Sequence, residues 1–319
     1  MSPLRRRAAS QGGAPVDLTT TVGSVELINP VMTASGTAGH GTELAAYVDF
    51  SAIGALVVKS LSADPWPGNP APRVHETAGG MINSIGLQGP GVAAWLSDEL
   101  PEVLATGARV VVSIWGTTVG DYERAAKMLL DAPDGVIAVE VNVSCPNHHD
   151  RNRMFAHSPD TTADAVEAAS VCGLPMWVKL SPNVSDIAAI AAAAAGAGAE
   201  AVTLVNTVLG MAIDPETRRP RLGAGGGGLS GPAIHPVAVR AVYDVHAAHP
   251  ELPIVGVGGV ATGVDAVELM LAGASAVQVG TASFADPRSV ERVRDEIEQW
   301  CRAHGVGAVR DLIGDAHVR

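Results

Sequence analysis

A short run of apolar or β-branched residues recurs eight times along this 319-residue chain, and each run is followed by a segment of helical character. This alternation predicts an α/β fold with a parallel sheet and helical crossovers, and eight such units close a TIM (β/α)8 barrel. The alternative is an open, doubly wound sheet of eight parallel strands with reversed order. The predicted strands are residues 31–34, 55–58, 109–113, 138–141, 176–178, 201–205, 254–256 and 276–279.

Local signals add elements around this barrel. Two alternating runs, 16–21 and 25–28, flank a Gly-Ser pair and predict an N-terminal β-hairpin. Acidic first turns, N-cap residues and glycine stops mark the ends of the helices. The predicted helices include residues 121–130, a helix that begins at Ser185 as N-cap and ends at 196 or 198, and residues 287–302.

Two long segments interrupt the alternation of strand and helix. Residues 60–100 are rich in proline, and residues 207–232 contain four consecutive glycines. Long βα-loop insertions in a compact barrel are usually functional, because the βα-loops form its active-site face. We expect a single barrel domain over residues 16–319 behind a disordered tail at residues 1–15.

Composition excludes several classes of protein. The 33 acidic residues outnumber the 21 basic ones, and the formal charge of −12 is opposite to that of a nucleic-acid-binding protein. The longest apolar run, residues 187–199, is too short to span a bilayer. The N-terminus lacks the apolar middle of a secretory signal, although its Arg and Ser content leaves a transit peptide open. Three scattered cysteines predict a cytoplasmic protein without disulfides or a metal site.

Two of the three lysines stand directly after predicted strands. Lys59 ends the run VVK and Lys179 ends WVK, so both would lie at the catalytic end of the barrel. A lysine there can stabilise negative charge on a cofactor or substrate, whereas the alternative is a snorkelling lysine at a strand end.

Asparagines repeat this pattern. Asn142 and Asn206 follow the fourth and sixth strands, and Asn83 lies in the first long loop. Taken singly, each reads as a turn residue. Together at one barrel mouth, their uncharged donors and acceptors suit a planar heterocycle with alternating carbonyl and N–H groups.

Cys145 lies just beyond the fourth strand in the segment EVNVSCPN. A free cysteine is most often a small buried hydrophobe, which is our interpretation of Cys172 and Cys301. Cys145 differs because Pro146 and Asn147 place it in a loop at the mouth, where it could act as a nucleophile or general base.

Glycine-rich loops follow the last two strands. The segments VGVGG at 255–259 and VGTASF at 279–284 occupy the standard phosphate position of a barrel, where backbone N–H groups bind the anion. With two strand-end lysines, flavin mononucleotide (FMN) is the candidate ligand.

Other kinds of site have little support in the sequence. The chain shows neither a Rossmann NAD motif nor a GxSxG serine motif, and His148 and His149 are adjacent rather than spaced for a metal. We interpret His75, His157 and His235 as surface or loop residues.

A set of short motifs closely resembles the class 1 dihydroorotate dehydrogenase family, and most of all its 1B subgroup. The motifs keep their order from about residue 18 to the C-terminal region. They are ASG at 34–36, VVKS at 57–60, GNPAPRV at 68–74, NSIGLQGPG at 83–91, NVSCPN at 142–147, VKLSPN at 178–183, VNT at 205–207, GGLSGPAI at 227–234, VGVGG at 255–259 and GASAVQVGTA at 273–282.

The resemblance implies an FMN-dependent oxidoreductase that converts (S)-dihydroorotate to orotate in pyrimidine biosynthesis. Cys145 would be the general base for the C5 proton, while the C6 hydride passes to flavin N5. The implied substrate-binding residues are Lys59, Asn83, Ile85, Gly86, Leu87, Asn142, Asn147, Asn206 and Thr207. The implied FMN-binding residues are Ser35, Gly36, Lys59, Ser60, Ser113, Asn142, Lys179, Val205, Gly231, Gly258, Gly259, Gly280 and Thr281.

The resemblance also implies partners. Members of the 1B subgroup pair with an iron–sulfur and FAD subunit that relays electrons to NAD, and this chain has too few cysteines to hold such a cluster alone. Members of the family generally associate, so a homodimer is expected as well.

The chain departs from the family pattern at several positions. The loop after SCPN reads HHDRNRMFAHSPD instead of a glycine-rich stretch, Ser113 stands where asparagine is common, Trp115 replaces a smaller residue, and His235 replaces the usual lysine. Two alternatives therefore stay open. One is a related FMN-dependent enzyme for another cyclic amide or a specialised metabolite, and the other is a catalytically silent barrel that binds FMN or phosphate.

Overall fold

Eight parallel strands form the centre of the computed structural model, which describes residues 15–147 and 153–317. They are ordered β3-β18-β17-β12-β11-β8-β7-β4, and a parallel bridge between Met32 and Ala55 joins the first strand to the last. The ring confirms the TIM barrel and excludes the doubly wound sheet. The strands are β3 Val31–Thr33, β4 Leu56–Val57, β7 Val110–Ile114, β8 Val136–Asn142, β11 Met176–Lys179, β12 Ala201–Leu204, β17 Ile254–Val257 and β18 Ala276–Val279.

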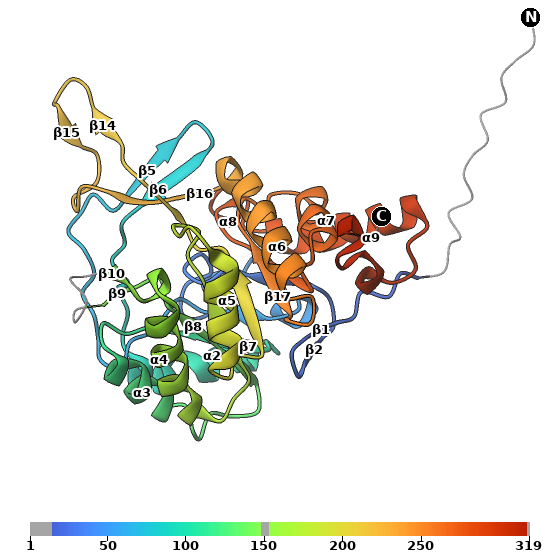
Figure 1. Ribbon diagram of the computed structural model, residues 1–319, viewed down its shortest axis with the longest axis horizontal. Coiled ribbons are helices and arrows are strands. Elements are labelled where there is room, and N and C mark those ends of the chain that lie inside the picture. Colours follow the sequence, from blue (N-terminus) through green and yellow to red (C-terminus); the bar gives the residue numbers. More distant parts are fainter. Residues whose placement is uncertain (1–14, 148–152, 318–319) are drawn as a thin grey trace, which may run out of the picture.

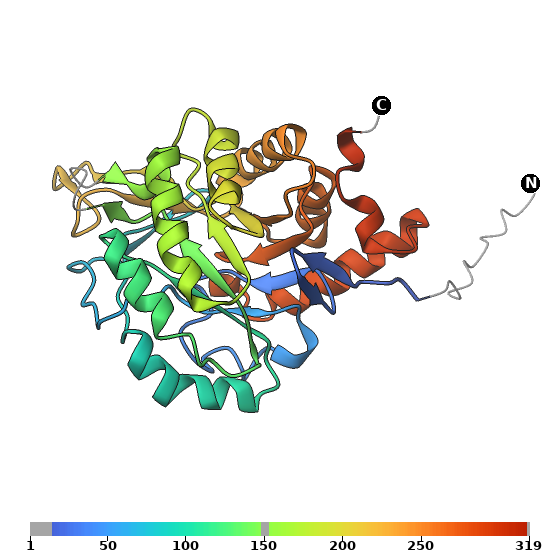
Figure 2. The ribbon, with the colours of Figure 1, turned by 60° about the horizontal axis from the view of Figure 1, so that its bottom comes forward.

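Helices cover the outside of this ring (Figure 1 and Figure 2). The predicted helices at 121–130 and 287–302 correspond to α3 and α9, and their ends differ from the prediction by two or three residues. The N-cap of α5 is Asp186 rather than Ser185, since its carboxylate accepts a hydrogen bond from Ala189 N at 3.0 Å. The helices are α1 Val92–Ala94, α2 Leu100–Ala105, α3 Val119–Lys127, α4 Pro159–Ala169, α5 Ile187–Gly196, α6 His235–Ala248, α7 Gly263–Leu271, α8 Ala282–Ala285 and α9 Ser289–His304.

Short turns of other helix types connect these elements. A π-helical turn, Trp95–Glu99, joins α1 to α2. The 3₁₀ turns are Phe50–Ala52, Phe155–His157, Ser170–Cys172, Pro232–Ile234, Val309–Leu312 and Asp315–His317.

The predicted N-terminal hairpin is present and closes the amino-terminal end of the barrel. Its strands, β1 Thr20–Val22 and β2 Val25–Leu27, alternate buried and exposed residues. The buried side chains of Val22, Val25 and Leu27 join a cluster with Trp177 and other residues near the starts of the barrel strands. The hairpin therefore seals the end opposite the βα-loops, because period-2 alternation turns one of its faces toward the barrel interior.

The two long segments are less irregular than the sequence predicts. They contribute to one antiparallel sheet of order β13-β16-β6-β5, in which Asn83 pairs with Gly228. Both segments follow barrel strands, so this sheet lies over the carboxyl ends of the barrel, as expected of a functional insertion. Its strands are β5 Val74–Thr77, β6 Gly80–Asn83, β13 Val208–Gly210 and β16 Gly227–Ser230.

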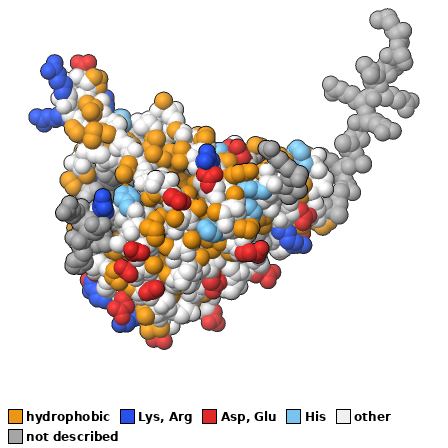
Figure 3. All heavy atoms as spheres, viewed as in Figure 1, with side chains coloured by type: hydrophobic (Ala, Val, Ile, Leu, Met, Phe, Trp, Pro, Cys, Tyr) orange, Lys and Arg blue, Asp and Glu red, His pale blue; other side chains and the backbone are white. Residues whose placement is uncertain are grey.

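A small hairpin, β14 Ile213–Asp214 and β15 Arg219–Pro220, extends from this sheet as an arm at the upper left of Figure 1. Figure 3 shows positive side chains at the tip of the arm and hydrophobic ones nearer its base. Met211 and Ile213 are each 59% exposed there.

Within residues 15–147 and 153–317, no helix is long and apolar enough to cross a bilayer. All of the predicted tail except Pro15 lies outside the described residues. The assignment of residues 16–319 to a single domain stays a prediction.

Leu27→Ala should lower the free energy of unfolding by about 2–5 kcal/mol, because it removes a fully buried side chain from the cluster that closes the barrel. Chemical denaturation measures this change. Glu26→Ala, on the exposed face of the same strand, is the matched control and should change stability by less than about 0.5 kcal/mol. Equal losses in the two variants would contradict the sealing role of the hairpin.

Candidate active site

The predicted site residues meet at the carboxyl ends of the barrel strands. Lys179 is the last residue of β11, and Lys59 stands two residues beyond the end of β4. Asn142 is the last residue of β8, and Asn206 follows β12. The predicted position of both lysines at strand ends is confirmed. Because the barrel is closed, the ends of these strands meet at one rim.

Hydroxyl and amide groups at or just beyond the ends of five strands form one hydrogen-bond network at this location. Ser60 Oγ shares hydrogen bonds with Ser113 Oγ at 2.8 Å and with Ser35 Oγ at 3.2 Å. Asn142 Nδ2 donates to Ser60 Oγ at 3.1 Å, and Asn206 Nδ2 donates to Asn142 Oδ1 at 3.3 Å. The structure thus brings together five predicted residues, and their uncharged donors and acceptors suit a polar, planar ligand.

Cys145 lies beside this network, with its side chain fully buried. Its Sγ donates to the carbonyl of Asn142 at 3.4 Å, and the Tyr122 hydroxyl donates to the same carbonyl at 2.8 Å. Burial raises the pKa of the Cys145 thiol, while the nearby hydroxyl of Tyr122 and the positive charge of Lys59 oppose that rise. Both neighbours favour the thiolate, which is the form of cysteine that removes protons.

Lys59 is itself largely enclosed, and burial lowers the pKa of its ammonium group, an effect that the Cys145 thiolate would oppose. Gly36, with φ of +88°, lies next to it, since a Cβ on Gly36 would be 3.8 Å from Lys59 Nζ. The two groups lower each other's cost of ionisation, so Cys145 and Lys59 form an electrostatic pair at the barrel mouth.

Asn83 and Thr207 approach each other where the two long segments pair. Asn83 Nδ2 donates to the carbonyl of Gly228 at 3.4 Å. A Cβ on Gly228 would lie only 2.0 Å from Thr207 Oγ1, so a glycine is needed there. Asn206 Oδ1 accepts from the backbone N–H of Thr207 at 2.7 Å. These contacts connect the second predicted substrate-binding set to the asparagine network.

The backbone at Ile85, Gly86 and Leu87 forms a tight loop beside Asn83. Gly86 and Leu87 have φ values of 72° and 61°, a left-handed conformation that is uncommon for leucine. Asn69 N donates to the carbonyl of Ile85 at 3.1 Å, and Arg73 donates to the carbonyl of Asn69 at 2.5 Å. The loop is therefore held in one conformation by two residues of the GNPAPRV motif, for which the sequence analysis assigned no role.

The unusual loop after Cys145 is described only in part. Asn147 lies in β9 Pro146–Asn147, which pairs with β10 Arg153–Met154, and its side chain is outside the described residues together with His148 and His149. Phe155 packs edge-on against Tyr122, with ring centroids 5.2 Å apart. The returning half of the loop thus supports the tyrosine that contacts Cys145.

The predicted phosphate-binding glycines lie close together. Gly231, Gly258 and Gly259 all have positive φ values, and a Cβ on Gly259 would lie 3.0 Å from the Gly231 carbonyl. Thr281, which follows Gly280, donates its hydroxyl to Ser230 at 2.8 Å. Val205 is buried at the end of β12. Backbone can approach a ligand closely at these glycines, as a phosphate site requires.

His235 contradicts its interpretation as a surface or loop residue. It is the first residue of α6 and is only 8% exposed. The signal available in the sequence was its place between Ile234 and Pro236, directly after the glycine-rich segment, where a helix start is expected.

Glu140 is a buried polar residue that the sequence patterns missed. It is fully buried in β8, and its Oε2 accepts from Gln278 Nε2 at 2.8 Å and from Thr203 Oγ1 at 3.2 Å. Lys179 Nζ lies 3.6 Å from Glu140 Oε1 and donates to Gln278 Oε1 at 3.2 Å. A lone acid within an apolar strand is the signal that could have found it, since a buried carboxylate needs partners.

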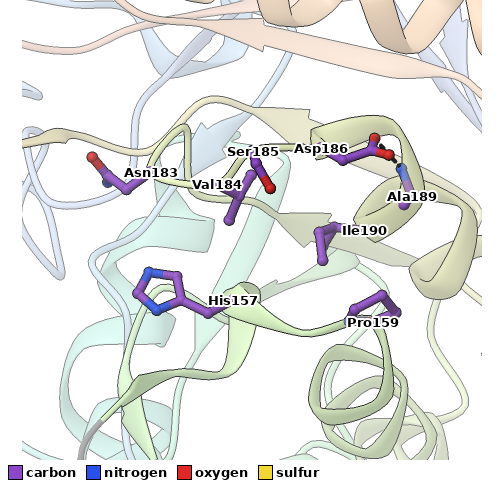
Figure 4. A pocket seen from close by; sticks show the side chains of 8 residues that line it. All are labelled: His157, Pro159, Asn183, Val184, Ser185, Asp186, Ala189 and Ile190. Carbon is purple, nitrogen blue, oxygen red and sulfur yellow. Dashed lines mark hydrogen bonds between the residues drawn. The ribbon is translucent and has the colours of Figure 1, made fainter.

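A cavity of about 330 Å³ lies between the start of α4 and the start of α5. Figure 4 shows His157 and Pro159 on one side and the segment from Asn183 to Ile190 on the other. Asn183 Nδ2 donates to the carbonyl of Thr207 at 2.9 Å, so this residue supports the site from outside. The cavity contains none of the predicted site residues.

Comparisons with known proteins agree with this geometry. A family model described as "Dihydroorotate dehydrogenase" matches residues 17–300. The chain is 48% identical to "Dihydroorotate dehydrogenase B (NAD(+)), catalytic subunit" of Geobacter sp. (strain M21), over 93% of this chain and 97% of that relative. It is 47% identical to "Putative dihydroorotate dehydrogenase A (fumarate)" of Solibacter usitatus (strain Ellin6076), again over 93% of this chain and 97% of the relative.

A solved structure has the same fold. The chain superposes on DHODH in complex with ferulenol from Eimeria tenella with a TM-score of 0.75, covering 95% of this chain and 89% of the other at 22% identity. The barrel fold and the match of the family model agree, and the resemblance to the 1B subgroup is confirmed by the similarity to B-type catalytic subunits. The chain belongs to the dihydroorotate dehydrogenase family.

Proposed function

We propose that this protein is an FMN-dependent oxidoreductase that oxidises (S)-dihydroorotate to orotate in pyrimidine biosynthesis. The observation that carries the proposal is the hydrogen-bond network at the barrel mouth, in which the buried Cys145 contacts Asn142 and Asn142 contacts Ser60, with the positive charge of Lys59 near the thiol. This arrangement offers a base, a cation and neutral amides together, in a chain of this family.

The residues present fit FMN. Glycines with positive φ meet where the loops after β16 and β17 approach each other, which suits a phosphate. Lys179, held by Glu140 and Gln278, offers a positive charge for the flavin ring. When bound, FMN supplies the two-electron acceptor for the C6 hydride. The proposed FMN-binding residues are Ser35, Gly36, Lys59, Ser60, Ser113, Asn142, Lys179, Val205, Gly231, Gly258, Gly259, Gly280 and Thr281.

Substrate binding is assigned to the other side of the network. Amide groups of Asn83, Asn142 and Asn206 can pair with the ring carbonyl and N–H groups of dihydroorotate. The proposed set also contains Lys59, Asn147, Thr207 and the backbone of Ile85, Gly86 and Leu87, which would hold the carboxylate.

Cys145 takes the proton in the proposed reaction. Its thiolate removes the C5 proton, the electron pair of that C–H bond forms the C5=C6 double bond of orotate, and the C6 hydrogen leaves as hydride. Tyr122 and Lys59 favour the thiolate before this step. Complete burial of the thiol shields the base from bulk water.

Electrons must then leave the site. Relatives named as catalytic subunits of a B (NAD(+)) enzyme suggest that a separate subunit receives them, and the resemblance to the 1B subgroup implies an iron–sulfur and FAD subunit. Cys145, Cys172 and Cys301 are buried without disulfide partners, and the described residues contain no group of three potential metal ligands. We propose such a subunit as partner. From the resemblance to the family we also propose a homodimer and a cytoplasmic location.

Cys145→Ala should reduce the rate of flavin reduction by dihydroorotate by about a hundredfold or more, because the general base is lost. Anaerobic stopped-flow absorbance measures this rate. FMN content should be unchanged, and Cys172→Ala, a buried cysteine outside the barrel mouth, serves as control with wild-type rates. Retention of the full rate by Cys145→Ala would rule out the proposed base.

The same rate should rise with pH. Burial raises the pKa of Cys145, so at neutral pH most of the thiol is protonated, and each step toward that pKa increases the fraction of thiolate. We expect about a tenfold increase per pH unit on the acid side of the profile. A rate that is constant between about pH 6 and pH 9 would contradict the involvement of a thiol with a raised pKa.

A further inference from the structure

His235 joins the glycine loop of the proposed phosphate site to helix α7. Its Nδ1 lies 2.8 Å from the carbonyl oxygen of Gly258, and its Nε2 lies 3.1 Å from Glu268 Oε2. The carbonyl can only accept, so the ring donates from Nδ1. The carboxylate of Glu268, whose side chain is 56% exposed, is likewise an acceptor and contacts the ring at Nε2.

The contact with Gly258 fixes the orientation of a peptide group. A peptide is planar, with its C=O and the following N–H pointing in opposite directions. By holding the carbonyl of Gly258, His235 therefore sets the direction of the Gly259 N–H. Among residues 15–147 and 153–317, no hydrogen-bond acceptor contacts that N–H, so it is available to a ligand.

Packing makes His235 a close neighbour of the loop. A Cβ on Gly259 would lie 2.6 Å from His235 Cβ and 3.0 Å from the carbonyl of Gly231. The His235 side chain thus contacts both Gly258 and Gly259, and Gly259 in turn lies close to Gly231. Glycine loops with positive φ are conformationally free, and ordering them costs binding energy unless a neighbour holds them.

We propose that His235 is a positioning residue for the phosphate group of the cofactor, which it preorganises by holding the Gly258–Gly259 peptide with Nδ1–H. This inference rests on the proposed FMN site and extends it. In it, His235 does not contact the ligand but orients the backbone N–H of Gly259, which does. The effect is specific to the phosphate and leaves the flavin ring contacts at Lys59 and Lys179 unchanged.

The test compares FMN with riboflavin, which has the same ring and ribityl chain but lacks the phosphate. Quenching of flavin fluorescence by the full-length apoprotein gives both dissociation constants. His235→Ala should weaken FMN binding about five- to tenfold, the effect of one lost hydrogen bond, and riboflavin binding by less than about twofold. His249→Ala is the matched control, since His249 contacts the carbonyl of Ala188 at the opposite end of α6.

Two amide variants test the role of Nδ1 separately from the loss of the whole ring in His235→Ala. The amide of His235→Asn can replace Nδ1 as donor to Gly258 and should restore FMN affinity to within about twofold of wild type. The amide of His235→Gln reaches the Nε2 position instead and should bind FMN as weakly as the alanine variant.

Three outcomes would overturn the inference. They are unchanged FMN affinity in His235→Ala and His235→Gln, equal losses for FMN and riboflavin, and equal behaviour of the Asn and Gln variants. If the unmodified protein binds FMN no more tightly than riboflavin, the proposed phosphate site is wrong and the inference falls with it. Failure of the phosphate site can be told from failure of the His235 role, because it would be seen in the unsubstituted protein.

Discussion

Closure of eight parallel strands into a ring is the constraint on which the rest of the structure depends. Parallel strands in a closed barrel have all their carboxyl ends at one rim, so residues distant in sequence must meet there. Strand β8 shows the consequence directly. It places Glu140 within the barrel and Asn142 at the rim, and Cys145 follows three residues later. Every chemical feature of the candidate site is a side chain or loop at this rim.

Of the two lysines at the rim, Lys179 has a buried counter-charge. It lies 3.6 Å from Glu140 Oε1 and donates to Gln278 Oε1 at 3.2 Å, while Lys59 lies near the Cys145 thiol and opposes the rise in its pKa. Removal of one member of a buried pair commonly costs about 3–5 kcal/mol, because the other charge is left without a partner. The site therefore keeps two cations next to a proposed anionic ligand while most of its remaining donors, on Ser60 and Asn142, are neutral.

Local sequence signals predicted the strands and the strand-end lysines, because apolar periodicity and strand termination are properties of a few neighbouring residues. Contacts between distant segments were not predictable in this way. Glu140 and Gln278 are 138 residues apart, and β6 and β16 come from different long loops. The prediction of His235 as a surface or loop residue is wrong because its burial depends on the Gly258 loop and on α7. The N-cap of α5 differed by one residue, since Ser185 and Asp186 are both good caps and tertiary geometry selected the aspartate.

The most direct test of the account is an anaerobic titration of the FMN-loaded protein with (S)-dihydroorotate, followed by the absorbance of the flavin. The account predicts stoichiometric bleaching, because proton removal by Cys145 and hydride transfer to the flavin are one oxidation. Flavin that stays oxidised in the presence of excess dihydroorotate would contradict the proposed reaction. That result would favour another cyclic amide as substrate, with the loop after Cys145 as the segment that selects it.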